Sequence, residues 1–133
     1  MQYLIDTHVC IWAIADKKRL SNKVIALLEN NDNKIFVSQI SIFEIAIKIQ
    51  TGKFVGFSST ISELIKEISL AGFEILPFKN EHAVAYSIFN FSTEHRDPFD
   101  RYLLITSIFE KKVPFITIDD KFQLYADIVE IIW

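Results

Sequence analysis

Four acidic side chains could do chemistry together in this sequence. Each stands at the end of a β-like run or in a helix-like run beside one: Asp6, Glu44, Asp100 and Asp119. Carboxylates that converge on one crevice raise each other's pKa unless a cation lies between them. Oxygen ligands without a neighbouring Cys or His pair favour Mg²⁺, with Mn²⁺ as the alternative, and His8, His82 and His95 lack zinc-site spacing. Such a site suits phosphodiester hydrolysis, because bound metal neutralises the phosphate and activates a water molecule.

Each acid also has a purely structural explanation. In the stretch "DPFD", Asp97 can be a helix N-cap, Pro98 the first helical residue, and Asp100 the third residue of a capping box. Similar structural roles are possible for the other three acids. Glu44 can form a capping box with Ser41 as the N-cap, and Asp6 and Asp119 can cap the helices that follow them. The structural explanation weakens only if the fold gathers all four helix starts at one place.

Short apolar, β-branched runs alternate with helical patterns along the chain. The expected strands are 2–5, 34–38, 73–78, 114–118 and 127–132, and the expected helices are 9–16, 21–32, 41–53, 60–73, 81–91 and 98–112, the last with a lysine-rich final turn. Strands separated by helices predict an α/β fold with a mostly parallel central sheet that is covered on both faces. In such sheets ligands bind beyond the carboxyl ends of the strands, where the four acids stand.

Composition indicates one globular domain over residues 1–133. Half of the residues are hydrophobic and 14% are aromatic, which is enough to fill a core. The lone Cys10 cannot form an internal disulfide and predicts a reducing, cytoplasmic setting. We expect neither a secretory signal nor a membrane span, because no apolar run approaches about 18 residues.

The net charge of −3 argues mildly against nucleic-acid binding through a broad basic surface. Basic side chains are local: Lys17–Arg19 form one group, while Arg96 and Arg101 flank the "DPFD" acids. The two arginines have two roles open to them, contact with a phosphate or a partner protein, and ion pairs with the nearby acids. A metal-based site would let an acidic protein act on RNA without a basic surface.

Four segments in order resemble the PIN-domain ribonucleases and, within them, the VapC-type toxins of bacterial toxin–antitoxin pairs. They cover nearly the whole chain: "LIDTHVCIWA", "SQISIFEIAIKIQTGK", "HRDPFDRYLLITSI" and "PFITIDDKF". The resemblance implies a single PIN domain with a three-layer α/β/α architecture. It also implies a Mg²⁺-dependent endoribonuclease in which metal-activated water attacks the phosphodiester, leaving a 5′-phosphate and a 3′-hydroxyl if the site holds two metal ions.

The family's acidic site matches this chain at Asp6, Glu44, Asp100 and Asp119, the last within a Thr-x-Asp pattern. The resemblance implies that Asp6 and Asp100 bind Mg²⁺ directly, and that Glu44 and Asp119 complete the site directly or through water. It further implies an RNA substrate, a VapB-type antitoxin and a homodimer. Asp97 departs from the general family pattern, and we interpret it first as the helix N-cap.

Three other function classes were compared with this one. A PIN fold kept as a binding or assembly module, with little nuclease turnover, is the main alternative. A phosphatase of the haloacid-dehalogenase type also opens with a strand and an aspartate, but it needs a second acid where this chain has His8. A response-regulator receiver is disfavoured, because no lysine follows the last strand.

Overall fold

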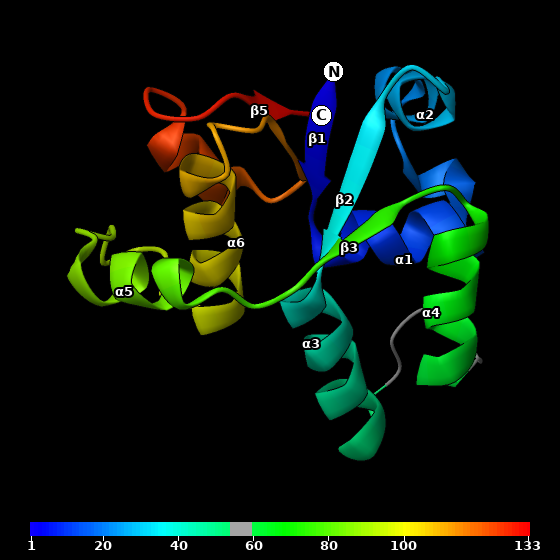
Figure 1. Cartoon of the computed structure of the whole chain (residues 1–133), viewed down its shortest axis with the longest axis horizontal. Helices are drawn as coiled ribbons and strands as arrows, with labels where there is room; N and C mark the ends of the chain where they lie inside the picture. Colours follow the sequence, from blue (N-terminus) through cyan, green and yellow to red (C-terminus); the bar gives the residue numbers. More distant parts are fainter. Residues whose placement is uncertain (54–59) are drawn as a thin grey trace.

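Five parallel strands form the centre of the molecule in the computed structural model, which describes residues 1–53 and 60–133 (Figure 1). The sheet order is β3-β2-β1-β4-β5. The strands are β1 (Gln2–Ile5), β2 (Lys34–Ser38), β3 (Glu74–Leu76), β4 (Phe115–Ile116) and β5 (Ile131–Ile132). The helices are α1 (Thr7–Ala15), α2 (Asn22–Glu29), α3 (Gln39–Gln50), α4 (Ile61–Leu70), α5 (Asn80–Ile88) and α6 (Pro98–Phe109), with short 3₁₀ turns η1 (Lys17–Arg19) and η2 (Asp120–Tyr125).

Helices cover both faces of the sheet, which gives the predicted three-layer α/β/α architecture. Strand side chains alternate between the faces: in β1, Tyr3 and Ile5 join one apolar cluster and Leu4 joins the other. The first cluster is completed mainly by α1, α2 and α4, and the second by α6 and η2. Figure 1 shows α5 and α6 on one side of the sheet and α2 and α4 on the other. This double burial explains why the strands are almost continuously apolar.

Two predicted helix starts are two residues too late, because α1 begins at Thr7 and α3 begins at Gln39. The helix that carries Glu44 begins at Gln39, and its N-cap is Ser38, whose hydroxyl accepts a hydrogen bond from the backbone N–H of Ile40. Ser41 is buried inside the first turn and therefore caps nothing. Glu44 consequently lies beyond the first turn, where a capping-box role is excluded.

Two chain segments near the C-terminus also differ from the sequence-based prediction. The sixth helix ends at Phe109, so Lys111 and Lys112 do not form its last turn but adopt left-handed backbone with φ of 61° and 55°. This reversal turns the chain toward β4, and Val113 donates its N–H to the carbonyl of Ser107. The last strand is confined to Ile131–Ile132 because the preceding residues form turns that follow η2.

Within the described residues, no helix combines the length and the apolar character needed to cross a bilayer.

Candidate active site

Asp6 and Asp119 lie at the same edge of the sheet because β1 and β4 are parallel neighbours. Asp6 follows β1 directly and caps α1, accepting the N–H of Thr7 at 2.6 Å. Thr117 lies between the two acids: its hydroxyl donates to Oδ2 of Asp6 at 2.7 Å and accepts the N–H of Asp119 at 3.0 Å. These two hydrogen bonds explain the Thr-x-Asp pattern, because one threonine positions both Asp6 and Asp119.

Glu44 reaches the same edge from α3. Its Oε1 accepts the hydroxyl of Thr7 at 2.9 Å, and its Oε2 pairs with the ammonium of Lys48 at 3.1 Å. The Thr7 hydroxyl also lies 2.9 Å from that of Ser41, so the buried Ser41 belongs to this polar network. Glu44 is therefore held in one orientation through both of its oxygens.

Asp100 lies in the first turn of α6, and Asp97 is the N-cap of that helix. Oδ1 of Asp97 accepts the backbone N–H of Asp100 at 2.9 Å, and the Asp97 side chain is exposed. The prediction that Asp97 starts the helix is confirmed. Asp97 satisfies the backbone N–H of Asp100. Neither carboxylate oxygen of Asp100 is used to cap the helix.

The acids perturb one another strongly. Burial, followed by the negative charges of Asp6, Asp97, Asp119 and Glu44, raises the pKa of Asp100 to about 8. Burial is also the main reason that the pKa of Asp6 is raised, although the Thr117 hydrogen bond and nearby His8 partly offset it. The fold therefore brings all four predicted site acids close enough to interact. Their convergence weakens the explanation that they are only helix caps.

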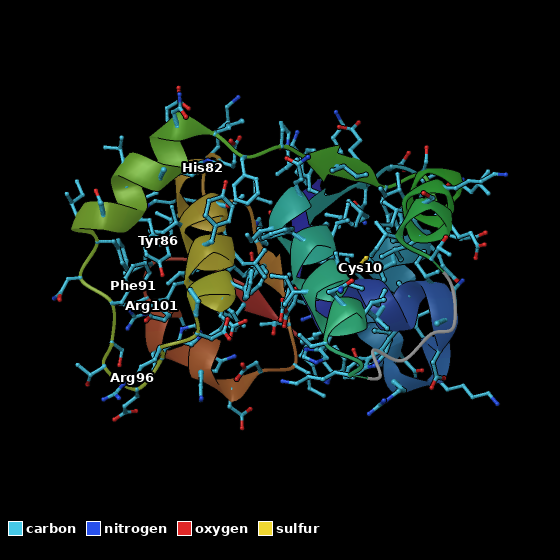
Figure 2. All side chains as sticks on the ribbon, turned by 90° about the horizontal axis from the view of Figure 1, so that it is seen from below. Cys10, His82, Tyr86, Phe91, Arg96 and Arg101 are labelled. Carbon is cyan, nitrogen blue, oxygen red and sulfur yellow. The ribbon has the colours of Figure 1, made fainter. Side chains whose placement is uncertain are left out.

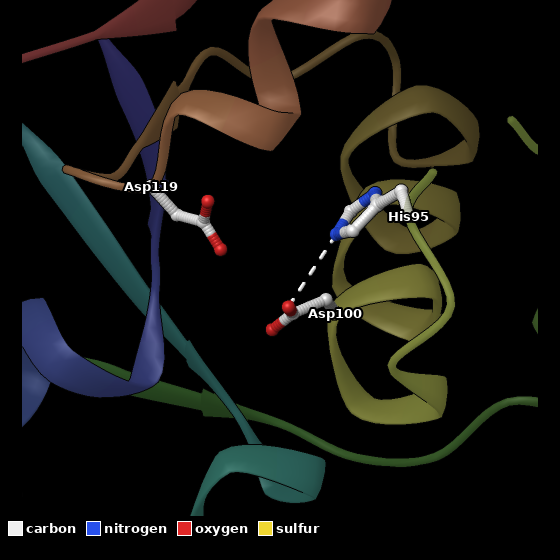
Figure 3. A group of neighbouring side chains, drawn as sticks. All are labelled: His95, Asp100 and Asp119. Atoms are coloured by element: carbon white, nitrogen blue, oxygen red, sulfur yellow. Dashed lines mark hydrogen bonds and ion pairs between the residues drawn. The ribbon is translucent and has the colours of Figure 1, made fainter. Parts of the chain in front are cut away.

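His95 completes this group and was not among the residues predicted from sequence. It is fully buried, and its Nε2 lies 3.4 Å from Oδ2 of Asp100 (Figure 3). One ligand atom each from His95, Asp100 and Asp119 lies within 4.8 Å of the others. The only signal in the sequence was its place five residues before Asp100, which no zinc-type spacing rule detects.

Comparison with protein family models shows which kind of domain this chain forms. The PIN domain model matches residues 3–128. The chain belongs to the PIN domain family. The resemblance to PIN domains seen in the sequence is thereby confirmed, and so is the expected PIN fold.

Solved structures share this PIN fold along almost their whole length. VapBC2 from Rickettsia felis, bound to a DNA fragment from its promoter, matches with a TM-score of 0.68 and 22% identity, covering 98% of this chain and 97% of that chain. VapBC-1 from nontypeable Haemophilus influenzae matches with a TM-score of 0.66, 18% identity and coverage of 98% and 96%. VapBC-5 from Mycobacterium tuberculosis matches with a TM-score of 0.59, 18% identity and coverage of 98% and 97%. Comparison with curated proteins gave no match.

The donor set of this PIN domain fits a divalent cation. Burial and the negative charges of the surrounding acids raise the pKa of Asp100, and a bound cation would offset the repulsion between these charges. Carboxylate oxygens with one imidazole nitrogen suit Mg²⁺ or Mn²⁺ better than zinc, which prefers several nitrogen or sulfur ligands. Asp100 and Asp119 offer the nearest oxygen ligands, with Asp6 and Glu44 beside them.

Within residues 1–53 and 60–133, neither arginine next to the PIN acids forms the ion pair that one interpretation of the sequence allowed. Among the described residues, Arg96 bonds the carbonyl of Thr93, while Arg101 bonds the carbonyls of His95 and Ser92. The guanidinium of Arg101 also lies 4.7 Å from the centre of the Phe91 ring, beside which Figure 2 shows it. Arg101 therefore holds the loop before α6 in place, and Arg96 remains exposed to solvent.

Proposed function

We propose that residues 1–133 form a single PIN domain that acts as a Mg²⁺-dependent endoribonuclease, the toxin of a toxin–antitoxin pair, in the cytoplasm. One observation carries the proposal: burial, together with the charges of Asp6, Glu44 and Asp119 from distant parts of the chain and of neighbouring Asp97, raises the pKa of Asp100 to about 8. A fold that needed only helix caps would gain nothing from this mutual repulsion. The charge excess is useful to a protein that must bind a cation and, through it, a phosphate.

Asp6, Glu44, Asp100 and Asp119 form the catalytic and metal-binding set. A bound Mg²⁺ supplies charge neutralisation at the scissile phosphate and a more acidic water. The chain's own contribution is orientation: Thr117 holds Asp6 and Asp119, while Thr7 and Lys48 hold Glu44. Because these carboxylates are already hydrogen-bonded, substrate binding requires little rearrangement of the site.

Cleavage of a single-stranded or looped RNA by the purified chain tests the proposal. We expect cleavage in Mg²⁺ or Mn²⁺, products with 5′-phosphate and 3′-hydroxyl ends, and complete inhibition by EDTA. Asp100→Asn should abolish cleavage while preserving the fold. Asp97→Asn is the matched control, because asparagine is also a good N-cap and this side chain is exposed.

Two results would contradict the assignment. Cleavage at the parent's rate by Asp100→Asn would remove Asp100 from the site. Activity that survived thorough chelation would exclude the metal-dependent mechanism. Absence of cleavage of any RNA by a folded, metal-loaded protein would favour the binding or assembly module instead.

A cognate antitoxin and a second copy of the chain are the proposed partners. Support comes from the VapBC structures with the same fold, one of which is described as a member of the VapBC family of toxin–antitoxin systems. Large apolar side chains are also exposed on α3 and on α5: Phe43 at 55%, Val84 at 63% and Ile88 at 81%. Co-expression with the product of the neighbouring gene should yield a complex that no longer cleaves RNA. Light scattering of the isolated chain should give the mass of a dimer, and a strictly monomeric mass would contradict the homodimer.

A further inference from the structure

His95 has an unusual environment for a buried polar side chain. It is fully buried in the loop before α6, and its ring packs edge-on against Phe122, with centroids 4.7 Å apart. Within the parts of the chain that are described, Nδ1 has no hydrogen-bond partner. Its Nε2 has only the 3.4 Å contact with Asp100, which is longer than a good hydrogen bond. Buried polar groups are normally satisfied, and Nε2, the nitrogen that faces the acids, has only this long contact, so it is Nε2 that can accept a ligand.

The direction of the ring is fixed by contacts outside the acidic group. Arg101 donates from its guanidinium to the backbone carbonyls of His95 and Ser92. The backbone N–H of His95 donates to the same Ser92 carbonyl. Phe122 and Tyr125 contact the ring itself. Figure 3 shows the result: the ring turns its Nε2 edge toward Asp100 and Asp119. The nitrogen is therefore oriented before any ligand arrives.

The distances between the ligand atoms of His95, Asp100 and Asp119 suit the coordination of one ion. A six-coordinate ion with ligands at about 2.1 Å places adjacent ligand atoms about 3.0 Å apart and opposite ones about 4.2 Å apart. The Nε2–Oδ2 distance of 3.4 Å lies between these values, and the largest separation in the group is below 4.8 Å. A contraction of a few tenths of an ångström would thus bring all three ligand atoms onto one ion.

We propose that His95 supplies an imidazole nitrogen ligand to the metal ion held by Asp100 and Asp119, and that this nitrogen makes the site prefer Mn²⁺ to Mg²⁺. The inference rests on the proposed metal-binding function and deepens it by naming a ligand and a metal preference. Mg²⁺ keeps its water and favours oxygen ligands, whereas an imidazole nitrogen is a better partner for Mn²⁺ and later transition metals. A site of carboxylates alone would lack this source of selectivity.

Spin-echo electron paramagnetic resonance of bound Mn²⁺ tests the ligand directly. We expect the wild-type chain to show modulation from one directly coordinated ¹⁴N nucleus. His95→Phe keeps an aromatic ring against Phe122 and removes both nitrogens, so the modulation should disappear. His8→Phe is the matched control, because His8 is the other histidine whose charge reaches the acids, and here the modulation should persist.

Calorimetric titration of the chain with Mn²⁺ and with Mg²⁺ gives the second measurement. Wild type should bind Mn²⁺ at least about tenfold more tightly than Mg²⁺, and His95→Phe should lose about tenfold in Mn²⁺ affinity while its Mg²⁺ affinity changes less. A wild-type Mn²⁺ complex without ¹⁴N modulation would overturn the proposal even if His95→Phe failed to fold. So would modulation that disappeared in His8→Phe alone.

These measurements separate the inference from the proposed function. RNA cleavage with bound Mn²⁺ but no nitrogen coupling would refute only the role of His95. A chain that bound no Mn²⁺ and cleaved no RNA would refute both.

Discussion

Replacing Asp100 by asparagine should stabilise the metal-free protein in alkaline solution while it abolishes cleavage. Burial and four neighbouring acids raise the pKa of Asp100 from 3.8 to about 8 in the folded state. The folded state therefore binds more protons than the unfolded state between about pH 4 and pH 8, and the free energy of unfolding falls as pH rises through this range. Asparagine carries no charge and escapes this loss.

The size of the effect follows from the shift and from the exposure of the group. A shift of about 4 units at 1.36 kcal/mol per unit sets an upper bound of about 6 kcal/mol. The Asp100 side chain is 21% exposed, so solvent screening reduces the expected gain to about 2 kcal/mol at pH 9. Below pH 4, where the carboxyl is neutral in both states, Asp100→Asn and wild type should be equally stable.

Urea unfolding in EDTA at pH 4, 6, 7.5 and 9 measures this difference. Asp97→Asn provides the comparison, because it keeps the helix cap and removes only one of the four charges that raise the Asp100 pKa, so it should give a small part of the gain. A repeat with Mg²⁺ should stabilise wild type and leave Asp100→Asn unchanged, since only wild type retains the full ligand set. The reasoning is refuted if the gain from Asp100→Asn is the same at every pH, or if the variant is less stable than wild type at pH 9.

Three further substitutions or probes follow from single contacts. Thr117→Val removes the hydroxyl that positions Asp6 and Asp119, so unfolding free energy should fall by about 1–3 kcal/mol and cleavage by more than tenfold; unchanged Mg²⁺ affinity and cleavage would contradict this. Arg101→Lys loses the two-carbonyl contact, and limited proteolysis should become faster within residues 91–97, whereas an unaltered digestion pattern would argue against a positioning role. Cys10 is buried and its pKa is raised to about 12, so a thiol reagent should react only at the rate of unfolding; rapid reaction of the folded protein would show that the interior is open.

The parts of the site that sequence predicts are those set by local rules. Asp97 and Pro98 start a helix because of their own backbone chemistry, and Asp6 and Asp119 share an edge because parallel strands end together. His95 could not be predicted in the same way. Its approach to Asp119 depends on the path of the loop before α6 and on the ring of Phe122, which are tertiary features.

In the fold, too, some features follow from the local sequence and others depend on tertiary contacts. Strand positions follow from buried, β-branched runs, whereas their ends depend on neighbours, so β4 and β5 pair over only two residues each. The choice between Ser38 and Ser41 as helix cap depended on where β2 stops, which apolar pattern alone does not specify. Left-handed backbone at Lys111 and Lys112 is likewise unexpected for residues other than glycine or asparagine.

The bond between Thr117 and Asp6 joins residues 111 positions apart, and it has a consequence for synthesis of the chain. The first strand can pair with β2 as soon as both leave the ribosome, but its other edge stays open until β4 emerges. A nascent or truncated chain that stops before Thr117 has neither the partner of Asp6 nor Asp119. The proposed nuclease would therefore lack its complete acidic site until synthesis had passed Asp119.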